Sequence, residues 1–191
     1  METQLHADLG ATCPLAPSAE NTANPYLLVE EFFYFTSICD YKKNLQTWFS
    51  CALSDQAVSA NASDMLFLHD QVIKLVQAGY VIATNNIAYV PECHTDDRTM
   101  GDWMKGIKGN SICEITTLLP HERLEPLVFL KNTLTLQDLK TIRYGLYEWL
   151  TCALCRTVSM NEFDAKYSLP LYETVVKVME AFYLILTSSR E

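Results

Sequence analysis

Four residues in the middle of the chain carry the donor atoms of a metal site. Cys93, His94, Cys113 and His121 are of the types that bind zinc, and they flank a stretch with little hydrophobic periodicity. A metal ion would hold that stretch together without a packed core. Their spacing matches no standard zinc finger, and adjacent cysteine and histidine ligands are difficult to place around one ion. We therefore expect ordinary loop residues and no cofactor, and a zinc-stapled adaptor remains an alternative.

The chain also contains a CxxC motif, Cys152-Ala153-Leu154-Cys155. Redox chemistry favours such a pair at the start of a helix, where the helix dipole lowers the thiol pKa. Here the pair follows Trp149 late in an expected helix, where the dipole raises that pKa. No second CxxC completes a zinc ribbon, so we expect Cys152 and Cys155 to be buried core residues.

His69 and the adjacent Asp70 suggest acid-base chemistry, but no nucleophile can be placed beside them from the sequence. The chain has no Glu-x-x-His pair, P-loop, dinucleotide fingerprint or Gly-x-Ser-x-Gly elbow. We therefore favour a protein without catalytic activity. A ligand-binding or enzymatic helical domain, with an inter-helix pocket built around His69 and Asp70, is the alternative.

Residues 91–120 are the least regular part of the chain and hold three of its six glycines. The backbone amides of 100–111, with Lys105 and Lys108, suggest anion binding, but the Gly-Lys-Ser/Thr ending of a P-loop is absent. Long irregular segments in compact domains are often functional. We expect a contact loop in which Trp103, Lys105 and Lys108 bind a partner.

Apolar residues at helical spacing dominate the rest of the chain. They predict four long helices and one short helix, over about 25–53, 63–79, 121–131, 135–158 and from 168 to beyond Leu186. Gly79 is expected to end the second helix as a left-handed cap. Asn24, then Ser63 or Asp64, and then Thr135 are expected to cap three of these helices. Ser168 is expected to cap the last helix, with Pro170 in its first turn.

Residues 80–90 change character and predict two short strands, Tyr80–Thr84 and Ile87–Val90, around an Asn85-Asn86 turn. Short apolar runs are equally compatible with a helix, so this assignment stays open. The predicted fold is mainly α: a bundle of four to five helices with a small β-hairpin and a long irregular loop. Residues 1–24 are expected to form a flexible N-terminal arm, and residues 25–191 a single helical domain.

The 191-residue chain has a formal net charge of −9, and 49% of its residues are hydrophobic. An acidic chain without a basic run does not suit nucleic acid. The start at Met1 lacks a signal peptide, and no run reaches the ~18 apolar residues of a membrane span. Seven irregularly spaced cysteines are typical of a reducing compartment, so we expect a cytoplasmic protein.

These features together predict a protein-protein interaction or regulatory module. Only 19% of the residues are charged, and the chain holds 10 Tyr, 8 Phe and 3 Trp. Aromatic residues are enriched at interfaces and charged residues are depleted there. The composition is therefore compatible with a homodimer or with a separate protein partner, and not with nucleic-acid or membrane binding.

Overall fold

The computed structural model describes residues 24–54, 61–90, 115–155 and 162–188, except for the side chains of 162–165. In these ranges the chain forms seven helices and no strand: α1 (Pro25–Phe35), α2 (Ile38–Leu53), α3 (Ala62–Asn85), α5 (Pro120–Leu124), α6 (Pro126–Thr133), α7 (Leu136–Leu154) and α8 (Glu162–Ser188). The predicted mainly α class is confirmed. The helices are more numerous than expected, and the predicted β-hairpin is wrong.

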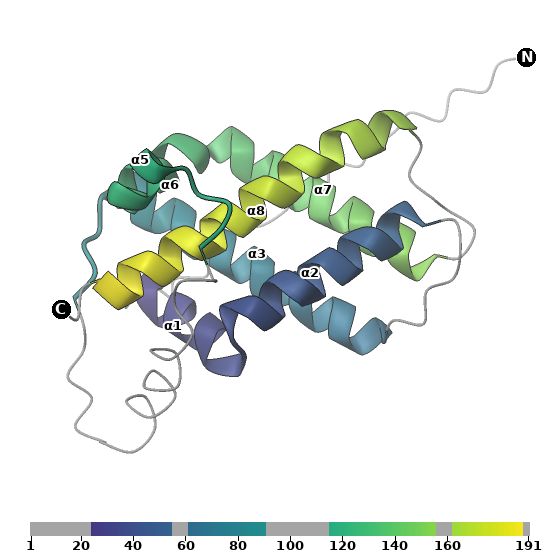
Figure 1. The fold of residues 1–191 in the computed structure, drawn as a ribbon, viewed down its shortest axis with the longest axis horizontal. Helices are drawn as coiled ribbons and strands as arrows, with labels where there is room; N and C mark the ends of the chain where they lie inside the picture. Colours follow the sequence, from purple (N-terminus) through teal and green to yellow (C-terminus); the bar gives the residue numbers. More distant parts are fainter. Residues whose placement is uncertain (1–23, 55–60, 91–114, 156–161, 189–191) are drawn as a thin grey trace, which may run out of the picture.

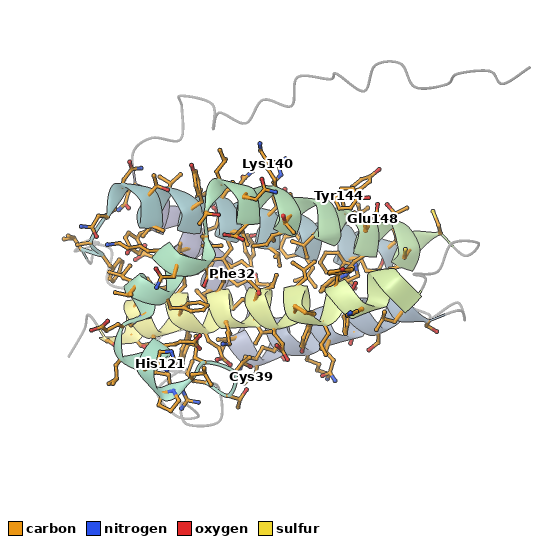
Figure 2. The ribbon with its side chains drawn as sticks, turned by 90° about the horizontal axis from the view of Figure 1, so that it is seen from above. Phe32, Cys39, His121, Lys140, Tyr144 and Glu148 are labelled. Carbon is orange, nitrogen blue, oxygen red and sulfur yellow. The ribbon has the colours of Figure 1, made fainter. Side chains whose placement is uncertain are left out.

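The long helices lie in two layers. Figure 1 shows α2 and α8 in front of α3 and α7, and Figure 2 shows the same layers from above, with Phe32 between them. Across the layers α2 packs on α7, and within them α3 packs on α7 and α2 on α8. The short helix α1 packs on α3, and α6 packs on α8. None of the described helices is long and apolar enough to cross a membrane.

The second half of α8 is the most enclosed part of the fold. Its buried side chains occupy almost every position of more than three turns: Val175, Val176, Val178, Met179, Glu180, Ala181, Phe182, Tyr183, Ile185 and Leu186. A helix that is buried on all sides must be surrounded by other elements. The helices α1, α2, α3, α5, α6 and α7 all contact α8, so it is the central element of the bundle.

The single helix predicted over 25–53 is two helices with a corner between them. Asn24 caps α1 by accepting a hydrogen bond from the Tyr26 amide at 3.0 Å, as expected. Thr36 is extended, and the Ser37 hydroxyl accepts from the Asp40 amide at 3.1 Å to begin α2. Ser and Asp at these positions are a helix N-cap pattern, although no glycine or proline marks the break.

The predicted strand Tyr80–Thr84 is the last part of α3, and Gly79 lies inside that helix rather than at its end. A Cβ atom on Gly79 would lie 2.6 Å from Leu134 Cδ1 and 3.0 Å from Phe182 Cε2. The glycine therefore lets Leu134, which follows α6, and Phe182 of α8 pack closely against α3. Asn86 is the true cap, with φ 54° and ψ 42°, in the left-handed region that Asn tolerates better than most residues.

The last helix also begins earlier than predicted. Because α8 starts at Glu162, Pro170 lies in its interior and Ser168 is not its cap. Ser168 is buried and accepts a hydrogen bond from Trp149 Nε1 at 3.2 Å, which joins α8 to α7. By contrast, the predicted cap of α7 is confirmed: Thr135 and Asp138 form a reciprocal capping box.

Two sets of hydrogen bonds hold the described residues on either side of 91–114 against the bundle. Before this segment, the Tyr26 hydroxyl donates to the Ile87 carbonyl at 3.1 Å, and the Tyr89 hydroxyl donates to Glu30 Oε1 at 2.6 Å. After it, the fully buried Glu180 accepts from three consecutive backbone amides at 2.8–3.1 Å, those of Thr116, Thr117 and Leu118. Glu180 also pairs with Lys42 of α2.

Candidate functional site

An open cavity of about 420 Å³ lies where α1 ends and where α2 and α3 come together. Its lining comes from three helices and from two cap residues, Thr36 after α1 and Asn61 before α3. The helical residues are Phe35 of α1; Tyr41, Asn44, Thr47 and Trp48 of α2; and Asp64, Met65, Phe67 and Leu68 of α3. We call this cavity the corner pocket. Its volume lies within the ~300–1,000 Å³ range typical of ligand sites.

The corner between α1 and α2 is held by interactions that fix one wall of the pocket. The Tyr41 hydroxyl of α2 donates to the Phe32 carbonyl of α1 at 2.8 Å. The two rings also stack, with centroids 3.9 Å apart and planes 14° apart. Both side chains are buried. Phe35, one turn after Phe32, therefore has a defined position at the pocket rim.

The opposite wall is the first two turns of α3. Asn61 caps this helix, and its Oδ1 accepts from the Ser63 amide at 3.1 Å. Sequence reasoning expected Ser63 or Asp64 as the cap. Asp64 instead lies in the first turn, where a carboxylate is favoured by the helix dipole, and it lines the pocket together with Phe67.

Three exposed aromatic side chains lie at the pocket rim and beside it. Tyr34, Phe35 and Phe67 are 56%, 49% and 44% exposed. The rings of Phe35 and Phe67 meet edge to face at 5.4 Å, and those of Tyr34 and Phe35 lie 6.3 Å apart. We call these three residues the aromatic patch. The helical spacing of Phe35 predicts a core position, and its exposure shows that this prediction is wrong.

The inner part of the pocket is apolar and tightly packed. Trp48, Met65 and Leu68 are buried, and the Trp48 ring meets Trp149 edge to face at 5.7 Å. Trp48 Nε1 is buried with no hydrogen-bond partner among the described residues. The pocket thus combines a rigid apolar base with an open aromatic rim.

The electrostatic character of the corner pocket is negative. Asp64 lines it, and the described lining contains no lysine, arginine or histidine. Burial raises the pKa of the Tyr41 hydroxyl well above its usual range, and the nearby charge of Glu31 raises it further. The carboxylates of Asp64 and Glu31 therefore place negative charge in and near the pocket. The nearby cation Lys43 of α2 is exposed and lies outside the lining.

His69 and Asp70, the residues that suggested acid-base chemistry, make separate contacts with their neighbours. The His69 ring packs edge to face on Trp48 at 5.9 Å. Burial lowers the pKa of His69; the Asp70 charge opposes that shift and Arg143 adds to it. Asp70 forms an exposed ion pair with Lys74 at 2.8 Å. Neither His69 nor Asp70 lines the corner pocket, so the alternative pocket built around them is not the one found.

The other predicted site residues are only partly described. The predicted partner-binding residues Trp103, Lys105 and Lys108 lie outside the described residues, as do Cys93, His94 and Cys113 of the alternative metal site. His121 is exposed on α5 (Figure 2). No group of metal-binding side chains occurs in the described part of the chain.

The cysteines of the CxxC motif are less buried than predicted. Cys155 is exposed at the end of α7, and Cys152 is only partly covered. The expectation of two buried core cysteines is therefore wrong for Cys155. The helix ends at Leu154, which places the second cysteine in the cap position rather than on the buried face.

A weak signal in the sequence pointed to the corner pocket. Phe35 is followed directly by the polar residues Thr36 and Ser37, the second of which is the N-cap of α2. Polar residues directly after an aromatic residue indicate a helix end, where part of the ring can stay exposed. Periodicity alone does not carry this information.

Comparisons with protein-family models, with curated proteins and with solved structures found no match to this chain. The corner pocket and the aromatic patch are therefore the features that bear on function.

Proposed function

We propose that the protein is a protein-protein interaction module without catalytic activity, and that the aromatic patch is its contact surface. The observation that carries this proposal is the cluster of Tyr34, Phe35 and Phe67, which are about half exposed and in ring contact with one another. Clustered exposed apolar side chains mark interaction sites more often than scattered ones do. Aromatic anchors beside a pocket are also typical of interface hot spots.

Exposure of the aromatic patch to water is unfavourable in free energy, and a partner that covers the patch would remove this penalty. Burying a phenylalanine side chain fully contributes about 1.5–3 kcal/mol, so two half-exposed rings leave a comparable amount unused. The corner geometry keeps Phe35 in place before binding, and preorganised side chains lose little entropy in a complex. A cytoplasmic location is part of the same proposal.

A photo-crosslinking experiment tests the contact surface. The photoreactive amino acid p-benzoylphenylalanine replaces Phe67 in cells that express the protein, and crosslinked adducts are identified by mass spectrometry. The matched control places the same group at Tyr144, which is 67% exposed on the outer face of α7 (Figure 2). We expect an adduct with another protein from position 67 and not from position 144, and its loss in a Phe35→Ser background.

Adducts in equal yield from both positions, or none from position 67, would show that the aromatic patch is not the contact surface. An adduct between two copies of the chain would identify the homodimer as the form of association. The predicted contact residues outside the described ranges remain a separate proposal. Alanine at Trp103 and Lys105 should lower capture of the same partner without loss of folding.

Small-molecule binding is the second candidate function, and the volume of the corner pocket favours it. A cavity of about 420 Å³ can hold a metabolite-sized molecule. A ligand present at about one hundred times its Kd stabilises the folded state by about 2.7 kcal/mol. Thermal unfolding with a metabolite panel measures this shift, and Phe67→Ser should abolish any response that comes from the pocket.

A further inference from the structure

The corner pocket has the chemistry of a site for a planar organic cation. We propose that it binds an arginine side chain, presented by the segment of the partner protein that covers the aromatic patch. This inference rests on the proposed function and names the chemistry of the partner.

The charge of the corner pocket is complementary to that of a cation. The lining contributes the carboxylate of Asp64 and no cationic side chain within the described residues. Asp64 is not a member of the ion pairs found there. Glu31 adds negative charge near Tyr41 and also interacts with Lys74, which lies outside the lining, and the whole chain carries −9. A cation entering this pocket gains attraction from a nearby carboxylate and is steered toward it by the field of the protein.

The aromatic rim of the pocket suits a guanidinium group. Phe35 and Phe67 line the pocket with about half of each side chain exposed. A guanidinium group is attracted to the face of an aromatic ring and stacks on it, because its planar charge is weakly hydrated. The compact ammonium group of lysine keeps its hydration more strongly. The rim therefore favours arginine.

The pocket lining also offers several oxygen atoms that can accept hydrogen bonds. Thr36, Asn44, Thr47 and Asn61 line the same pocket. The Thr47 hydroxyl already donates to the Lys43 carbonyl at 2.9 Å, so its oxygen is left as an acceptor. A guanidinium carries five N–H donors and no acceptor. A lining with several oxygen acceptors and one carboxylate matches that donor set.

The corner pocket is continuous with the aromatic patch, which favours a peptide over a free cation as the source of the guanidinium. The open side of the pocket is bordered by Phe35 and Phe67, which belong to the aromatic patch. A free small cation would fill the pocket and leave Tyr34 uncovered. A peptide segment with apolar residues beside an arginine would cover the patch and fill the pocket together.

Two short peptides test the inference on the full chain. One is acetyl-Leu-Arg-Phe-Leu-amide, and the other carries citrulline, the neutral isostere of arginine, in place of the arginine. Binding is followed by NMR through the indole N–H signal of Trp48, which Trp48→Phe assigns. We expect the arginine peptide to bind about five- to tenfold more tightly, as the sum of one exposed ion pair and one cation–π contact.

The variants Asp64→Asn and Asp70→Asn form a matched pair. Both remove one negative charge from α3, but Asp70 lies outside the pocket lining and pairs with Lys74. We expect Asp64→Asn to reduce the preference for arginine to about two- to threefold, the part that the cation–π contact supplies, and Asp70→Asn to retain the full preference. The two peptides on the unaltered chain keep the test valid if a variant folds poorly.

Equal affinity of both peptides, no signal change at millimolar peptide, or an unchanged preference in Asp64→Asn would overturn the inference. Its failure is separable from failure of the proposed function. If position 67 crosslinks a partner and Asp64→Asn leaves the adduct yield unchanged, the contact surface stands and the arginine site is wrong. If position 67 captures no partner, the proposed function itself fails.

Discussion

Glu180 shows at the scale of a single residue how this fold uses a buried charge. The carboxylate is completely enclosed in α8 and accepts hydrogen bonds from the amides of 116–118 and from Lys42. Burial alone would raise its pKa. The hydrogen bonds from Lys42 and from the Thr116 and Leu118 amides outweigh burial and hold that pKa below its ordinary value of 4.5. The charged form is therefore the one that stabilises the fold.

This arrangement predicts an acid-sensitive stability. A carboxyl whose pKa is lower in the folded state contributes stability that is complete above its unfolded pKa and is lost as the pH falls through the folded pKa. We expect Glu180→Gln to lower the free energy of unfolding by about 2–4 kcal/mol near neutral pH, because Lys42 and three amides lose a charged partner. The difference from the unaltered protein should shrink toward about pH 3.

Urea unfolding at the two pH values measures this effect, and Glu122→Gln is the control. Burial would raise the pKa of Glu122, but the Leu119 amide and Lys177 lower it overall. Its pair with Lys177 at 2.9 Å is less enclosed than that of Glu180, so we expect a loss of only about 1 kcal/mol. A larger loss for Glu122→Gln than for Glu180→Gln would contradict the role assigned to Glu180.

At the scale of the element, two helical glycines differ in what surrounds them. Gly79 in α3 faces Leu134 and Phe182, which are both buried. Gly145 in α7 faces the side chain of Leu171, which is only half-buried. A methyl group at Gly79 must displace packed core atoms, whereas at Gly145 one partly exposed side chain can rotate away.

Alanine at these two positions should therefore have opposite consequences. Gly79→Ala is expected to lower the free energy of unfolding by about 1–2 kcal/mol, because overpacking exceeds the gain in helix propensity. Gly145→Ala is expected to leave stability unchanged or to raise it by up to about 1 kcal/mol. Denaturant midpoints compare the two variants. A stabilised Gly79→Ala variant would show that α3 has room at this contact.

The helical class, the cap of α7 and most of the core were predictable from the sequence, because apolar spacing and capping residues are local signals. Residues 80–90 were not. Their β-branched and aromatic residues suggested strands, but Ile82 and Ala83 are buried on the extended α3, and such packing overrides local propensity. Asn85 and Asn86 were expected to form the turn of a hairpin, whereas Asn86 is the cap that ends α3. The corner pocket depends on three helices meeting, which no single segment encodes.

At the scale of the whole molecule, the enclosure of α8 predicts an uneven distribution of stability. Residues 175–186 contact elements on every side, whereas Lys166, Tyr167 and Leu169 near the start of the same helix are exposed. Amide hydrogens in enclosed elements exchange only through large unfolding events. Hydrogen exchange followed by mass spectrometry should show the slowest exchange in 175–186 and faster exchange in 166–169 and α5. Greater protection of α5 than of 175–186 would contradict this description of the core.

The hydrogen bonds on either side of residues 91–114 also bear on how such a chain can evolve. Tyr89 is held by Glu30 before this segment, and Thr116–Leu118 are held by Glu180 after it. The first anchor depends on two side chains, whereas the second uses backbone amides, which every residue type except proline supplies. The residue types at 116–118 can therefore change during divergence without loss of this anchor, provided that none becomes proline. Glu30 and Tyr89, by contrast, must be kept or replaced together.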